Sequence, residues 1–352
     1  MSGTNAGTWK PLHDQALSQV RHQHCRADQK DADSHDITSH ERLAGTLTAT
    51  RRQYADRPQE TRMTDEIAKW GRRIHGPTFP GTGIRCARDT GLTDAEMNEV
   101  VTTIATARAG RHTAFLPEHL RTRHWESTMT AMLSINARLG WPSAGWKIGA
   151  ASLEVQRAEG MPGASPGQLA RNGVHPSPAH VPAHLFINYR CAESEFAFRM
   201  AHALPARSTP FSEDEVADAV ASLHPALEIG DTVFEDWYSS SGYFGAALDN
   251  NGAAAFVPGD PVTDWRHIDL ASARVDLSLN GKWQKSGVGE AAMGHPLTAL
   301  TWVTNWLRER GMGLHAGEFV STGSCTGHFF VAPGDRLIAD FGPLGKVDAT
   351  FE

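Results

Sequence analysis

Two glutamates separated by one residue, Glu193 and Glu195, lie in the stretch CAESEFAF, residues 191–198. Phe196 and Phe198 alternate with smaller or polar residues, which predicts a β-strand. Strand side chains repeat every second residue, so both carboxylates project from the same face. Such a pair indicates either a solvent-exposed strand face or two ligands of a hard cation such as Mg²⁺ or Mn²⁺, which prefers carboxylate oxygens.

A third carboxylate follows in HPALEIGD, residues 224–231, where Glu228 stands between Leu227 and Ile229. If these two apolar neighbours pack into the protein, Glu228 projects from the opposite face of its strand, toward whatever the first two glutamates face. A single glutamate in such a strand most often faces solvent. Three glutamates on two strands instead favour a shared site for a divalent cation.

Lys147 lies in GWKIG, between Trp146 and Ile148, in a segment that is expected to be largely buried. A buried ammonium needs an anionic partner or a lowered pKa. Lys147 is therefore either a structural ion-pair partner or a catalytic group, which would bind an enolate oxygen or relay a proton.

Two loops could complete a site. The stretch STGSCTG, residues 321–327, supplies small hydroxyls and backbone amides, so Thr322 and nearby N–H groups suit a substrate carboxylate. A tight turn would use the same residue types. Asp249 and Asn250 either orient the site or shape a turn.

Helices must position these strands and loops. The stretch TDAE, residues 93–96, predicts a capping box at Thr93, and a second helix is predicted over residues 122–139, ending at Gly140. Helices before a strand-rich second half predict an α+β fold rather than a doubly wound sheet. The remaining predictions are helices at 211–224 and 295–311, strands at 144–150, 191–198, 225–231, 253–259, 273–283 and 317–324, and a C-terminal hairpin turning at 342–345.

The composition fits a globular core without nucleic-acid or membrane partners. Hydrophobic residues make up 40% of the 352, and the formal net charge of −7 leaves no basic footprint for nucleic acid. No apolar run approaches transmembrane length, and no secretory signal is visible. Four widely spaced cysteines form neither a zinc pattern nor a disulfide framework, so a reducing cytoplasm is expected.

Residues 1–92 are interpreted as a polar N-terminal extension, and residues 93–352 as the catalytic domain. Residues 1–62 lack a sustained apolar period, which predicts a largely disordered or loosely helical segment. Its HQHC cluster, residues 22–25, is either solvated or metal-binding. A Gly/Pro-rich linker, HGPTFPGTG, follows at residues 75–83.

From about Asp94 onward the chain resembles the 2-keto-4-pentenoate hydratase branch of the fumarylacetoacetate hydrolase superfamily. The resemblance covers roughly three quarters of the chain, and its motifs occur in the order of the family. The motifs are GWKIG (145–149), AESEFAF (192–198), HPALEI (224–229), LDN (248–250), HPLTALTWV (295–303), AGEFVSTGSCTG (316–327) and PGDRLIADFGPLGKV (333–347).

The resemblance implies a mixed β-roll or β-sandwich core with flanking helices, and a homo-oligomer. It implies Mg²⁺ or Mn²⁺ held by Glu193, Glu195 and Glu228, with the cation cancelling their repulsion. It also implies catalytic roles for Lys147 and for the two loops that carry Thr322 and Asp249. The implied reaction adds water to a 2-hydroxy-2,4-dienoate and yields a 4-hydroxy-2-oxo acid, in the catabolism of aromatic or related compounds.

Three alternatives stay open. Two features depart from the hydratase pattern of the branch. The stretch before the strand with Glu193, HVPAHLFINYRC at residues 180–191, lacks the acidic residues that are typical there. Glycine and alanines follow the Asp-Asn pair, where serines are typical. Decarboxylation of a 2-oxo acid, which needs the metal as electron sink and one proton donor, is therefore the main alternative. Carbon–carbon bond hydrolysis and an inactive binding homologue are the others.

Overall fold

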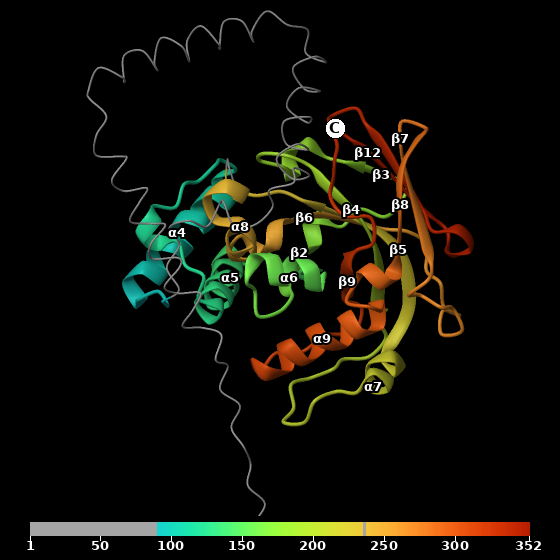
Figure 1. Cartoon of the computed structure of the whole chain (residues 1–352), viewed down its shortest axis with the longest axis horizontal. Helices are drawn as coiled ribbons and strands as arrows, with labels where there is room; N and C mark the ends of the chain where they lie inside the picture. Colours follow the sequence, from blue (N-terminus) through green and yellow to red (C-terminus); the bar gives the residue numbers. More distant parts are fainter. Residues whose placement is uncertain (1–89, 235–236) are drawn as a thin grey trace, which may run out of the picture. The chain divides into compact units, whose positions relative to one another are not determined.

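The computed structural model describes residues 90–234 and 237–352 (Figure 1). The predictions for residues 1–89, including the HQHC cluster and the Gly/Pro-rich linker, lie outside the described residues. Among the described helices, none is both long and apolar enough to cross a membrane.

Two helices open the described chain, as the sequence predicts. Helix α4 (Asp94–Gly110) begins with a complete capping box between Thr93 and Glu96. Helix α5 (Trp125–Leu139) ends at Gly140, whose left-handed conformation provides the C-cap. The two helices pack through a cluster that includes Val100, Ile104 and Ile135. Figure 1 shows α8 (Trp237–Leu248) beside them.

A seven-stranded mixed sheet carries all of the predicted site residues except Asp249. Its strands follow the order β2-β1-β9-β4-β5-β6, and β10 adds to β4. All pairings are antiparallel except β1 with β9. The strands are β1 (Ser143–Gly149), β2 (Ser165–Ala170), β4 (Cys191–Met200), β5 (Val220–Gly230), β6 (Ala253–Pro258), β9 (Phe319–Ser324) and β10 (Phe329–Phe330).

A second sheet of five strands has the order β3-β12-β11-β7-β8. The single strand expected at 273–283 is wrong: it is a hairpin, because Asn280 and Gly281 both adopt positive φ and reverse the chain. The predicted C-terminal hairpin is confirmed. The strands are β3 (Ala179–Val181), β7 (Arg274–Leu279), β8 (Lys282–Val288), β11 (Arg336–Asp340) and β12 (Lys346–Phe351).

The remaining helices flank the sheets. Helix α9 (Pro296–Glu309) starts with its predicted proline, and α6 (Leu153–Glu159) follows β1. Helix α7 (Glu213–Asp218) is much shorter than the predicted helix at 211–224. Its second half forms the start of β5, because residues from Val220 onward pair with β4. Tertiary pairing thus overrides a local helical pattern.

The main core explains why the glutamates share a face. Phe196 and Phe198 of β4 point into a large apolar cluster that also contains Val347 and Ala349 of the second sheet. The Phe196 and Phe341 rings lie 5.2 Å apart edge to face. Because strand side chains alternate, Glu193 and Glu195 project from the other face of β4. The architecture is the expected α+β fold, with two packed sheets and flanking helices.

Candidate metal centre and active-site cavity

The three predicted glutamates converge on one point. Glu193 on β4 lies directly opposite Glu228 on β5 in the antiparallel register. One ligand atom from each of Glu193, Glu195 and Glu228 lies within 4.8 Å of the other two. Glu195 and Glu228 are completely buried, and Glu193 is half-buried. Buried like charges at this range are unfavourable unless a cation compensates them.

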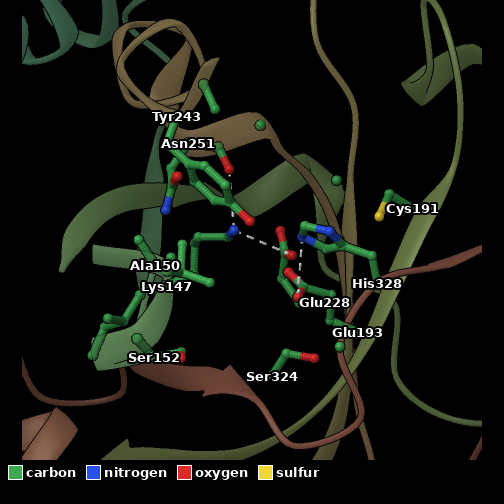
Figure 2. A pocket seen from close by; sticks show the side chains of 18 of the residues that line it. Lys147, Ala150, Ser152, Cys191, Glu193, Glu228, Tyr243, Asn251, Ser324 and His328 are labelled. Carbon is green, nitrogen blue, oxygen red and sulfur yellow. Dashed lines mark hydrogen bonds and ion pairs between the residues drawn. The ribbon is translucent and has the colours of Figure 1, made fainter. Parts of the chain in front are cut away.

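Lys147 is the cation that the chain itself supplies. Its side chain is 4% exposed, and Nζ lies 3.3 Å from Glu228 Oε2. Nζ also donates to the Asn251 backbone carbonyl at 3.0 Å (Figure 2). Burial disfavours the ammonium, but attraction to Glu228, Glu193 and Glu195 outweighs burial and raises the Lys147 pKa. Lys147 is therefore held as a charged ammonium.

One ammonium does not balance three carboxylates. Burial raises the pKa of Glu195 to about 7, with repulsion from Glu193 adding to the shift. Burial also raises the pKa of Glu228 well above its ordinary value, against the attraction of Lys147. A divalent cation would supply the remaining charge, since +2 and +1 together match the three carboxylates. The donor set, which is all carboxylate oxygen, fits such a cation.

The orientation of Glu195 also fits a metal ligand. Its Oε2 accepts hydrogen bonds from Ser321 Oγ at 2.6 Å and from the Gly323 backbone N–H at 2.8 Å. Within the described part of the chain, Glu195 Oε1 and Glu228 Oε1 make no hydrogen bond although both atoms are buried. Buried oxygens of this kind need an electropositive partner.

A cavity of about 420 Å³ opens beside the glutamates. Figure 2 shows Lys147 between the glutamates and the residues Ala150 and Ser152. The lining combines the carboxylates with small apolar and hydroxyl-bearing side chains. Its described residues are Lys147–Ser152, Val155, Tyr189, Cys191, Glu193, Glu228, Gly230–Thr232, Tyr243, Ala246, Asn251, Gly252, Ala291, Ser324, Cys325, Gly327 and His328.

A bulge in β9 directs the Thr322 and Ser324 side chains into different surroundings. The register between β4 and β9 shifts at this point, and Gly323 has a φ of +111°. A Cβ at Gly323 would lie 2.6 Å from Ala151 Cβ, so only glycine fits. Thr322 is completely buried and donates to the Phe196 backbone carbonyl at 2.8 Å, away from the described lining. Ser324 lines the cavity instead.

Asp249 lies behind the cavity rather than in its described lining. Its carboxylate forms a buried bidentate pair with Arg108 of α4, at 2.7 and 2.8 Å. It also accepts from Thr232 Oγ1 at 2.7 Å and from the Val233 N–H at 2.8 Å. This network anchors the turn that presents the Asn251 carbonyl to Lys147.

Sequence reasoning did not single out several lining residues, among them Ser324, Tyr243 and His328. Ser324 lies in the stretch STGSCTG, which the sequence indicates as a substrate-binding loop through Thr322. Tyr243 is placed by a break in α8 at Gly242, which has non-helical dihedral angles. His328 Nε2 lies 3.5 Å from Glu193 Oε1. Neither Tyr243 nor His328 belongs to a recognisable spacing pattern.

The chain was compared with families, curated proteins and solved structures. No family model matches the chain. A 4-oxalocrotonate decarboxylase of Pseudomonas putida is 31% identical over 137 residues, 39% of this chain and 51% of that relative. The match therefore spans about half the length of the decarboxylase.

Longer matches fall on hydratases. A 2-keto-4-pentenoate hydratase of Burkholderia vietnamiensis is 30% identical over 207 residues, 59% of this chain and 77% of that relative.

A solved 4-oxalocrotonate decarboxylase from Pseudomonas putida G7, complexed with magnesium and adipate, shares the fold. Its TM-score is 0.67 at 24% identity, covering 74% of this chain and 99% of that one. The chain belongs to the 2-keto-4-pentenoate hydratase branch of the fumarylacetoacetate hydrolase superfamily.

Proposed function

We propose that the protein is a metal-dependent hydratase, which adds water to a 2-hydroxy-2,4-dienoate and forms a 4-hydroxy-2-oxo acid in the catabolism of aromatic or related compounds. The observation that carries the proposal is the buried triad of glutamates with Lys147 in the wall of one cavity. Two 2-keto-4-pentenoate hydratase relatives, of which the chain covers 82% and 77%, support this activity.

In this proposal Glu193, Glu195 and Glu228 hold Mg²⁺ or Mn²⁺. When bound, the cation supplies Lewis-acid stabilisation of a 2-oxo acid and its enolate. The protein fixes the ligands beforehand: Ser321 and Gly323 hold one oxygen of Glu195 and leave the other for the cation. Lys147 keeps Glu228 in place through their ion pair.

The chain's own groups then handle charge and protons. The enol hydroxyl loses its proton and C5 gains one, which gives a 2-oxo-3-enoate; water then delivers OH to C4 and H to C3. The Lys147 ammonium stabilises negative charge that develops on the 2-oxygen. Ser324 Oγ is buried and makes no hydrogen bond to described residues, so it is positioned to bind the substrate carboxylate.

Thr322 and Asp249 act in this proposal through the elements that they hold. Thr322 ties β9 to β4 beside Glu195. Asp249 ties the turn at residues 249–252 to α4, which fixes the Asn251 carbonyl that Lys147 contacts. Neither side chain needs to contact the substrate for these effects.

Decarboxylation is the second candidate, because a decarboxylase relative is 31% identical. The test follows a purified 2-hydroxypenta-2,4-dienoate by absorbance with added Mg²⁺ or Mn²⁺, and identifies the product by NMR. We expect a 4-hydroxy-2-oxo acid and no release of CO₂. Metal-dependent CO₂ release from a 2-oxo acid, without hydration of the dienoate, would favour the decarboxylase. Metal binding without turnover of either would favour an inactive binding homologue.

The same proposal includes a cytoplasmic homo-oligomer that acts on a small molecule. The relatives, which are bacterial enzymes, support the small-molecule substrate. Light scattering of the purified chain and fractionation of cells would test the oligomer and the compartment.

A further inference from the structure

The cavity extends past the metal centre into space that small residues enclose. Its volume of about 420 Å³ falls in the range of pockets that bury drug-sized ligands. This volume is larger than that of a short dienoate. Val155 and Ile148 are the larger aliphatic side chains of the described lining. Two tyrosines, Tyr189 and Tyr243, and two cysteines also line the cavity, and most of the remaining apolar positions are alanines and glycines.

Helix α6 (Leu153–Glu159) lies beside this space. Helix α6 borders the cavity through Val155, and Ser152 immediately precedes the helix. Figure 2 shows Ala150 and Ser152 on the side of Lys147 that lies away from Glu193 and Glu228.

Apart from Asp231, the charged groups of the described lining lie at the metal end. Lys147 Nζ lies 3.3 Å from Glu228, and His328 Nε2 lies 3.5 Å from Glu193. The Asp231 carboxylate accepts hydrogen bonds from three backbone N–H groups, at residues 187–189. No lysine, arginine or histidine of the described lining stands apart from the glutamates.

We infer that the cavity selects a substrate whose tail is uncharged and larger than a methyl group. The inference rests on the proposed function, which places the 2-oxo end of the acid at the glutamates and leaves its tail to the alanine- and glycine-lined space. An apolar tail gains by burial there. A terminal carboxylate would lose its hydration without meeting a cation.

Stable 2-oxo acids test the tail without relying on turnover. Calorimetry with saturating Mg²⁺ would compare pyruvate, 2-oxohexanoate and 2-oxoadipate. We expect 2-oxohexanoate to bind at least tenfold more tightly than pyruvate, since each buried methylene contributes roughly fourfold. We also expect 2-oxoadipate to bind at least tenfold more weakly than 2-oxohexanoate. Equal or tighter binding of 2-oxoadipate would overturn the inference.

Two variants test the wall itself. Val155→Lys introduces a cation and should strengthen 2-oxoadipate binding about tenfold. The uncharged control Val155→Met should keep the wild-type order of affinities for the three 2-oxo acids.

Ala291→Leu fills exposed space in the lining and should weaken the binding of 2-oxohexanoate but not that of pyruvate. The matched control is Ala109→Leu, at an exposed site on α4 outside the lining. Unchanged preferences in both cavity variants would show that the tail does not reach this wall.

The outcomes separate this inference from the proposed function. If the expected order of 2-oxo acids is found but no dienoate is hydrated, the proposed hydration fails and the tail preference stands. If a dienoate is hydrated but 2-oxoadipate binds best, the hydratase stands and the tail preference fails.

Discussion

Replacing Lys147 by Met separates a catalytic role from a structural one. The change keeps an apolar stem but removes the ammonium that lies 3.3 Å from Glu228 in a buried site. Removal of one partner from a buried ion pair costs about 3–5 kcal/mol. For a domain of this size that corresponds to a loss of roughly 10 °C in melting temperature. We expect this loss in the metal-free protein.

Saturating Mg²⁺ should recover much of the lost stability, because a cation that binds the folded state stabilises it and compensates the carboxylates. The turnover should not recover. Loss of one preorganised electrostatic donor lowers kcat by on the order of a hundredfold or more. Both are measured on one preparation, by thermal unfolding and by steady-state turnover of a 2-hydroxydienoate. The control is Lys282→Met, at an exposed position on β8.

A Lys147→Met variant that melts much earlier, yet keeps its kcat while folded, would refute the catalytic role. A variant whose stability does not respond to Mg²⁺ would refute the shared charge balance between the lysine and the metal.

Three further predictions address the metal, the network behind the cavity and the N-terminus. Glu195→Gln should abolish divalent-metal binding by calorimetry while the protein stays folded, because an amide cannot replace the carboxylate charge; full metal affinity would exclude Glu195 as a ligand. Asp249→Asn and Arg108→Met should each cost about 3–5 kcal/mol, since each leaves a buried charge unpaired. The double variant should cost much less than the sum, and additive losses in denaturant unfolding would contradict the pairing. Deletion of residues 1–62 should leave the melting temperature almost unchanged, because this segment lacks apolar periodicity; a large loss would show that it docks on the rest of the protein.

The sequence determined the strand that carries Glu193 and Glu195 and the face they share, because the period of two is a local property of an extended chain. It also determined the capping box at Thr93 and the end of α5 at Gly140, which depend on a few neighbouring residues. The convergence of Glu228 with the first two glutamates was predicted, and the structure brings their ligand atoms together.

The tertiary structure decided which hydroxyl of the β9 loop faces the cavity. Alternation along a strand fails at a bulge, and the bulge at Gly323 depends on pairing with a strand more than a hundred residues away in the chain. Thr322 therefore contacts the Phe196 carbonyl, while Ser324 lines the cavity. A different pairing, of β5 with β4, ends α7 at Asp218 and makes the following residues part of β5.

The partners of the buried charges were likewise beyond local sequence. Lys147 could be recognised as a buried ammonium from its apolar neighbours, but only the fold places it against Glu228 and Asn251. Asp249 could be recognised as a turn residue, but its pair with Arg108 joins positions 141 residues apart. Local patterns fix which face a side chain projects from. The partner that it meets depends on how distant segments pack, because each buried charge must be compensated by whatever the fold brings near it.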